Sequence, residues 1–157
     1  NIIPMLRGRG NSIYAYTFSG YWKDVGTIES YYETNMELLD PDSGFNIFEE
    51  EMKVYSNSNM YPPSYNGPEA KVSNCLICNG CSVLGTVDHS ILSFGVQVEE
   101  GAKVIDSILL PGAVVKKGAR VERAIIGENT VIEEGAVFGD ASGEEIAVIG
   151  DNDVVEK

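Results

Sequence analysis

The second half of this 157-residue chain repeats with a fixed spacing. Large aliphatic residues recur every five or six positions, and a smaller residue usually stands two places before each. From Val87 onward the steps run 5, 6 and 6, so that three steps add to 17 residues. The large residues are Ile77, Val83, Val87, Leu92, Val98, Val104, Leu109, Val115, Val121, Ile126, Ile132 and Phe138. A period this regular predicts a coil in which every third strand returns to the same place one turn later.

A coil of three short strands and three corners is a triangular prism. Its turns stack at about 4.8 Å, the spacing of neighbouring strands in a sheet, and the stacked turns share one core. Glycines recur where the corners are expected, at Gly101, Gly118 and Gly135. The pattern resembles the hexapeptide-repeat left-handed parallel β-helix, and the left-handed winding is implied by that resemblance alone. We therefore expect a mainly β fold, with the β-helix over residues 72–157 and a short α/β tail before it.

The same register places the three cysteines. Cys75 and Cys81 occupy small inward positions, whereas Cys78 points outward. An odd number of closely spaced cysteines is a poor disulfide framework, and alternating orientation prevents a three-thiol metal cluster. The pattern predicts reduced thiols without a metal.

Composition divides the chain ahead of the repeats. Twelve of the fourteen aromatic residues lie in the first 65 positions. The sequence predicts a strand from Ser12 to Phe18 and a helix from Thr27 to Leu39, with Thr27 as the N-cap and Asp40-Pro41 as the stop. One strand and one helix bury little surface, so residues 1–40 are expected to complete a larger domain of a longer chain. Residues 41–71, rich in proline and glycine, are expected to be a linker.

Charge limits the possible partners. The chain has 24 acidic and 11 basic residues, for a net charge of −13. This balance disfavours binding to nucleic acid or to an anionic membrane. No apolar run is long enough for a membrane helix, and no signal peptide is visible. We therefore expect a cytoplasmic protein.

The stretch GYWKDVGTIESYYETNMELL, residues 20–39, resembles the end of the catalytic domain in the glucose-1-phosphate adenylyltransferase family. The wider sugar nucleotidyltransferase family shares only W-x-D-x-G-T, here Trp22, Asp24, Gly26 and Thr27. NIIPML, residues 1–6, and SVLGTVDHSIL, residues 82–92, extend the resemblance. It implies that ATP and α-D-glucose 1-phosphate react to ADP-glucose and diphosphate.

In that family the aspartate of the motif binds Mg²⁺, so Asp24 is the candidate catalytic and metal-binding residue. The family's second metal-binding aspartate lies farther upstream than this sequence reaches. By residue type alone, a cap of the helix that begins near Thr27 is the favoured role of Asp24, and the resemblance reverses this preference. Retention of Asp24 indicates a catalytic rather than a regulatory subunit.

The resemblance also implies a homotetramer, or a hetero-oligomer with a regulatory subunit, and control by a phosphorylated effector. Lys103 and Arg120 are 17 positions apart and should lie side by side. Like charges at sheet spacing repel unless an anion bridges them, which makes this pair a candidate effector or anion site. The alternative is a solvated pair. The register instead brackets Lys116 and Lys117 with glutamates.

The rival enzyme class is a hexapeptide-repeat acyltransferase, which would use the single histidine, His89, as general base. His89, Asp106 and Arg123 are each 17 positions apart, which favours an outward polar ladder instead. An acyl-carrier site also needs a loop or a neighbouring subunit, and we expect no long loop between the coils. A non-enzymatic scaffold is the third possibility.

Overall fold

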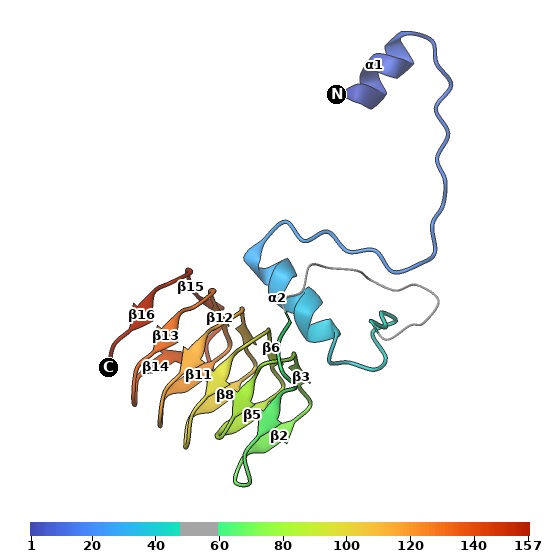
Figure 1. Ribbon diagram of the computed structural model, residues 1–157. Helices are drawn as coiled ribbons and strands as arrows, with labels where there is room; N and C mark the ends of the chain where they lie inside the picture. The colour runs from blue at the N-terminus through green and yellow to red at the C-terminus, as the bar shows by residue number, and fades with distance from the viewer. Residues whose placement is uncertain (48–59) are drawn as a thin grey trace.

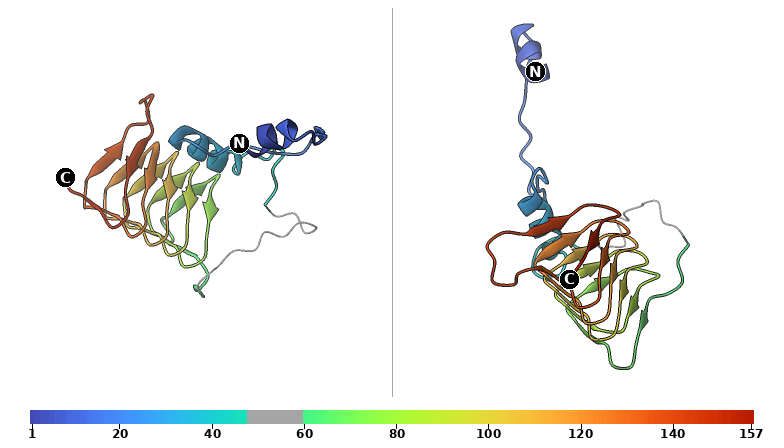
Figure 2. Two further views of the ribbon diagram at one scale, coloured as in Figure 1. Left: turned by 90° about the horizontal axis from the view of Figure 1, so that it is seen from above. Right: turned by 90° about the vertical axis from the view of Figure 1, so that its left-hand side faces the viewer.

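The computed structural model describes residues 1–47 and 60–157. In these residues sixteen short strands wind into a solenoid with three parallel sheets (Figure 1). Each turn adds one strand to every sheet, so neighbours within a sheet are three strands apart in the chain. Viewed along its axis, the solenoid is triangular (Figure 2). The predicted parallel β-helix is confirmed.

We name the three sheets A, B and C. Sheet A has six strands: β1 (Tyr65–Asn66), β4 (Ser82–Val83), β7 (Gln97–Val98), β10 (Val114–Val115), β13 (Val131–Ile132) and β16 (Val154–Val155). Sheet B has five: β2 (Lys71–Ser73), β5 (Thr86–Asp88), β8 (Lys103–Ile105), β11 (Arg120–Glu122) and β14 (Val137–Gly139). Sheet C has five: β3 (Leu76–Ile77), β6 (Ile91–Leu92), β9 (Ile108–Leu109), β12 (Ala124–Ile126) and β15 (Ala147–Ile149).

The core follows the predicted register. In sheet B, Val87, Val104, Val121 and Phe138 are aligned on successive strands, 17 residues apart. The small residues two places earlier also point inward, and Ala119 is fully buried. Cys75 and Cys81 belong to this core or pack against it, as predicted, whereas Cys78 does not. Large and small side chains therefore alternate around a narrow, continuous interior.

Three parts of the solenoid depart from a regular series of 17-residue turns that begins at residue 72. It begins at Tyr65, inside the stretch predicted as a linker, because Tyr65 N donates to Cys81 O at 2.8 Å. The rest of that predicted linker lies partly in residues 48–59, outside the described ranges. The turn that joins Ile77 to Leu92 spans 15 residues, two fewer than later turns, as the sequence indicated.

The third departure is a correction. Ala147 pairs with Ala124, 23 positions earlier, so this turn holds six residues more than its predecessors. The expectation that no long loop interrupts the coils was wrong. The extra residues form a projecting loop, residues 140–146, which is visible beside the last strands in Figure 2. We call it the inserted loop.

Two helices precede the solenoid, α1 (Ile2–Gly8) and α2 (Ile28–Glu37). The predicted N-cap of α2 is confirmed. The Thr27 hydroxyl accepts a hydrogen bond from Ser30 N at 3.1 Å, and the Ser30 hydroxyl accepts one from Thr27 N. The last turn tightens to shorter-range bonds, with Leu39 N donating to Met36 O. The helix therefore ends before Pro41.

The predicted strand from Ser12 to Phe18 does not form. The segment is extended, but no described strand lies beside it to accept its backbone hydrogen bonds. A strand requires such a neighbour, whatever its intrinsic propensity. The tail is thus helical rather than α/β, and in the described ranges neither helix is long and apolar enough to cross a membrane.

Candidate functional site

Helix α2 lies against the outer face of sheet C (Figure 1). Tyr32 from the helix and Ile108 and Ile125 from the sheet form a second buried cluster, separate from the solenoid core. Ile108 is only 1% exposed although it points away from the core. Burying one such side chain stabilises the fold by about 1.5–3 kcal/mol. The contact attaches the N-terminal segment firmly to the solenoid.

The sequence contained a signal for this contact that the inward register did not use. Strands of sheet C carry two large aliphatic residues in succession: Leu76-Ile77, Ile91-Leu92, Ile108-Leu109, Ile125-Ile126 and Val148-Ile149. Successive residues in a strand face opposite sides, so such pairs indicate a sheet that is buried on both faces. Sheet C is therefore the face of the solenoid that a helix covers.

Polar contacts add to the docking. The Tyr32 hydroxyl donates to the backbone oxygen of Asp106 at 2.6 Å, and the guanidinium of Arg123 lies 5.7 Å from the centre of the Tyr32 ring. Burial raises the pKa of Tyr32, so the phenol stays a donor. His89 Nδ1 contacts Asp106 Oδ1 at 2.6 Å. The predicted outward ladder is confirmed for His89 and Asp106, whereas Arg123 turns to the helix.

These ladder residues stand at a corner that demands an unusual backbone. His89, Asp106 and Arg123 have φ values of +43°, +47° and +48°, in the left-handed region. Asp and His tolerate this region better than Arg does. Behind them, Ser90 and Ser107 are fully buried, and Ser107 N donates to the Ser90 hydroxyl at 3.1 Å. The corner is thus held by hydrogen bonds between turns.

The inserted loop contacts the same corner. Arg123 Nη2 donates to the backbone oxygen of Glu144 at 3.5 Å. Loop, corner and the first half of α2 enclose a cavity of about 430 Å³, lined by Ile28, Glu29, Tyr32, Glu33, Arg123, Glu144, Glu145 and Ile146. The loop therefore lies against the docked helix.

The loop that carries Asp24 is tied back to α2. The Tyr21 hydroxyl donates to Glu37 Oε2 at 2.7 Å, and Lys23 Nζ donates to Glu37 Oε1 at 2.6 Å. The Tyr21 ring also stacks on Phe45, with ring centres 4.9 Å apart. The bonds to Glu37 raise the pKa values of Tyr21 and Lys23, and Lys23, with Tyr21, lowers the pKa of Glu37.

Asp24 itself is exposed, and it has no hydrogen-bond or ion-pair partner among the described residues. It does not cap α2, because Thr27 and Ser30 already form the capping box. The neighbouring Trp22 is 76% exposed. A free carboxylate of this kind fits Mg²⁺, which binds through one or two carboxylates plus substrate phosphates. No cluster of three ligating side chains occurs in the described ranges, so Asp24 would supply one ligand.

The structure aligns Lys103 with Arg120 on neighbouring strands, as the spacing predicts. However, Arg120 forms an ion pair with Glu122, whose side chain is 10% exposed. The premise that both cations lack a partner therefore fails for Arg120, although Lys103 has none in the described residues. Lys71, two strands further along the same column, escaped the sequence reasoning. The anion site stays a prediction.

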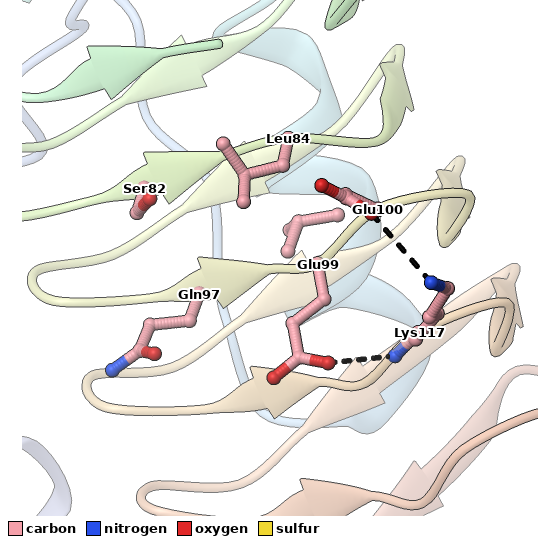
Figure 3. Close-up of a pocket in the computed structure, with 7 residues that line it drawn as sticks. Ser82, Leu84, Gln97, Glu99, Glu100 and Lys117 are labelled. Carbon is pink, nitrogen blue, oxygen red and sulfur yellow. Dashed lines mark hydrogen bonds and ion pairs between the residues drawn. The ribbon is translucent and has the colours of Figure 1, made fainter.

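A second cavity, of about 280 Å³, opens at the edge of sheet A (Figure 3). Lys117 N donates to Glu99 Oε2 at 2.9 Å, and Lys117 Nζ lies 3.6 Å from Glu100. Lys116 likewise pairs with Glu133 at 2.8 Å. The predicted neutralisation of both lysines is confirmed, and this cavity offers no unpaired cation to an anionic ligand.

Comparisons with known proteins match two parts of the chain to different families. Residues 62–149 match the GlmU-like C-terminal hexapeptide family, and residues 1–41 match the nucleotidyl transferase family. Glucose-1-phosphate adenylyltransferases from two strains of Desulfitobacterium hafniense, DSM 10664 / DCB-2 and Y51, are each 41% identical over 157 residues. The match covers 97% of this chain and 39% of each relative. The chain thus belongs to the GlmU-like C-terminal hexapeptide family, and it is homologous to the nucleotidyltransferase glucose-1-phosphate adenylyltransferase.

Proposed function

We propose that this chain forms the C-terminal part of an enzyme that joins ATP and α-D-glucose 1-phosphate to give ADP-glucose and diphosphate. The observation that carries the proposal is the free Asp24 carboxylate, placed in W-x-D-x-G-T just before a helix that the solenoid holds. The identity to adenylyltransferases extends over both parts of the chain. The alternative of another sugar-1-phosphate nucleotidyltransferase differs only in its substrates.

In this reaction a phosphate oxygen of the sugar attacks the α-phosphorus of ATP in line. A new P–O bond forms, and the bond between the α-phosphorus and the bridging oxygen breaks, which releases diphosphate. Both reactants are anions, so positioning and charge neutralisation dominate catalysis. Mg²⁺, when bound, would neutralise this charge. Asp24 would bind it from the protein side.

The solenoid would serve subunit association and regulation. The docked α2 supports this role, since it connects the Asp24 loop physically to the repeats. We propose a cytoplasmic homotetramer, or a hetero-oligomer with a regulatory subunit, that responds to a phosphorylated effector. The acyltransferase alternative finds less support, because the inserted loop lies on α2 and none of the cavities described above includes His89.

The test is pyrophosphate exchange with glucose 1-phosphate by the full-length protein. Asp24→Asn should lower turnover by orders of magnitude while the melting temperature changes little, because the side chain makes no hydrogen bond or ion pair in the described residues. Glu29→Gln, an exposed acidic residue in the first turn of α2, is the control and should retain activity. Near-normal turnover of Asp24→Asn would remove Asp24 from the site, and activity in residues 1–157 alone would contradict the expected need for upstream residues.

A further inference from the structure

The segment that carries Asp24 has no regular secondary structure, but it is held at two points. At one, Tyr21 and Lys23 bind the two carboxylate oxygens of Glu37. At the other, Thr27 closes the capping box with Ser30. Asp24 lies between these two points. Its position is therefore set by contacts of its neighbours and by none of its own.

Helix stability does not explain why a glutamate stands at position 37. It is the last residue of α2, where the helix dipole disfavours a negative charge, and no basic residue stands in that last turn. The compensation comes instead from the Asp24 loop, through Lys23 and Tyr21. Glu33, one turn earlier, reaches Lys23 only at 3.4 Å and its side chain is 64% exposed. The geometry thus concentrates the contact on one carboxylate.

The helix that bears Glu37 is itself fixed. Tyr32, five residues before Glu37, is bonded to Asp106 and packed against Ile108. A continuous series of contacts therefore runs from the solenoid corner through Tyr32 and α2 to Glu37, and on to the loop of Asp24.

We infer that Glu37 is a positioning residue for Asp24, which holds the metal-binding loop at a fixed place relative to the solenoid. This inference rests on the proposed function. Mutation of a residue that orients a metal ligand from the outer shell typically costs about 10- to 100-fold in metal affinity, because a loosely held ligand must be ordered when the metal binds. Glu37 thereby connects the solenoid to the metal site.

The test uses the full-length protein and two measurements: Mn²⁺ affinity by electron paramagnetic resonance, and the Mg²⁺ concentration that gives half-maximal turnover. Glu37→Gln should weaken Mn²⁺ binding and raise the Mg²⁺ requirement by about 10-fold, with an unchanged melting temperature. Glu33→Gln makes the same chemical change one turn away and should shift both by less than about twofold, because its contact with Lys23 is long and exposed.

A third variant, Lys23→Met, tests whether Lys23 and Glu37 act together. We call the bonds from Tyr21 and Lys23 to Glu37 the clamp. If the clamp acts as a unit, combining Lys23→Met with Glu37→Gln should add little to the effect of either. Equal behaviour of Glu37→Gln and Glu33→Gln, or additive effects in the double variant, would overturn the inference. Failure of the proposed function looks different. The wild-type protein would then lack exchange activity, while Mn²⁺ affinities of wild type, Asp24→Asn and Glu37→Gln would still show whether Glu37 acts on Asp24.

Discussion

The solenoid and the N-terminal segment treat their apolar residues in opposite ways. In the solenoid the inward residues of the central turns are almost completely buried, with Val104 and Val121 at 0% exposure. In the N-terminal segment Tyr14 and Tyr16 are 88% and 91% exposed. Each solenoid turn is covered by the next turn, whereas the extended segment has no such neighbour. The solenoid can thus bury its own apolar residues because its turns repeat.

Helix α2 belongs by sequence to the N-terminal segment and by contact to the solenoid. Its Tyr32 side is buried on sheet C, although residues 11–20, which precede it, are all exposed. One helix therefore crosses the boundary between the two regions. Its contacts connect the repeats to the loop that carries Asp24.

The largest effect is expected from overfilling the solenoid core. Ala119→Leu places three extra carbons into a closed, stacked core and should cost roughly 1–3 kcal/mol of unfolding free energy. Val137→Leu, on the outward side of sheet B and 61% exposed, is the matched control and should cost little. Chemical denaturation of both variants measures this. Equal losses would mean that the register is wrong.

Glu122, which follows the inward Val121 on β11, is not a suitable control although the register predicts that it points outward. Its side chain is 10% exposed and pairs with Arg120. Replacement by leucine would remove the partner of Arg120 as well as change the surface.

The next effect concerns the helix that joins the regions. Tyr32→Phe removes the bond to the Asp106 carbonyl and should loosen α2 by about 1 kcal/mol, the typical worth of one hydrogen bond. Tyr31→Phe is the control, because the Tyr31 hydroxyl makes no hydrogen bond in the described residues. Hydrogen exchange of the α2 amides should accelerate about fivefold in Tyr32→Phe only. No difference between the two variants would contradict the docking.

A smaller effect is expected when pH changes the stabilising contribution of the clamp. The pKa of Glu37 is lowered by Lys23 and Tyr21, so its contribution is present above the ordinary glutamate pKa of about 4.3 and is lost as pH falls through the lower folded-state pKa. The pKa values of Tyr21 and Lys23 are raised, so their contributions persist up to about pH 10 and are lost above it.

Trp22, the single tryptophan of this chain, reports on the loop between the clamp residues. Its fluorescence anisotropy should stay constant from about pH 5 to 9 and fall only at a pH below the ordinary glutamate pKa of about 4.3, as Glu37 takes up a proton. Glu37→Gln should show the low anisotropy at every pH, whereas Glu33→Gln should follow the wild type. An acid transition that survives in Glu37→Gln would point to another group.

The smallest expected effect is at Lys103 and Arg120. Because Glu122 already neutralises Arg120, we expect weak phosphate binding in which Lys103→Ala reduces affinity by about threefold, and Arg120→Ala by less. Calorimetric titration of the full-length protein with inorganic phosphate checks this, with Lys116→Ala, a lysine paired to Glu133, as control. The same affinity in all three variants would leave Lys103 and Arg120 as ordinary surface charges.

The features that could be predicted from the sequence depend on residues close together in the chain or on the 17-residue period. The 17-residue spacing predicted the coil, the aligned inward residues and the ladder at His89, and residue type predicted the N-cap at Thr27. Each of these follows from one turn stacked on its copy or from a few consecutive residues, so the sequence pattern contains the whole geometry.

Contacts between segments that share no period became apparent only in the tertiary structure. It placed α2 on sheet C, directed Arg123 to Tyr32, paired Arg120 with Glu122, joined Glu37 to the Asp24 loop and left Ser12 to Phe18 without a strand partner. The physical reason is that these contacts join segments with no common period. Their choice depends on which apolar face or charge remains uncovered after the solenoid has formed, and no local propensity encodes that.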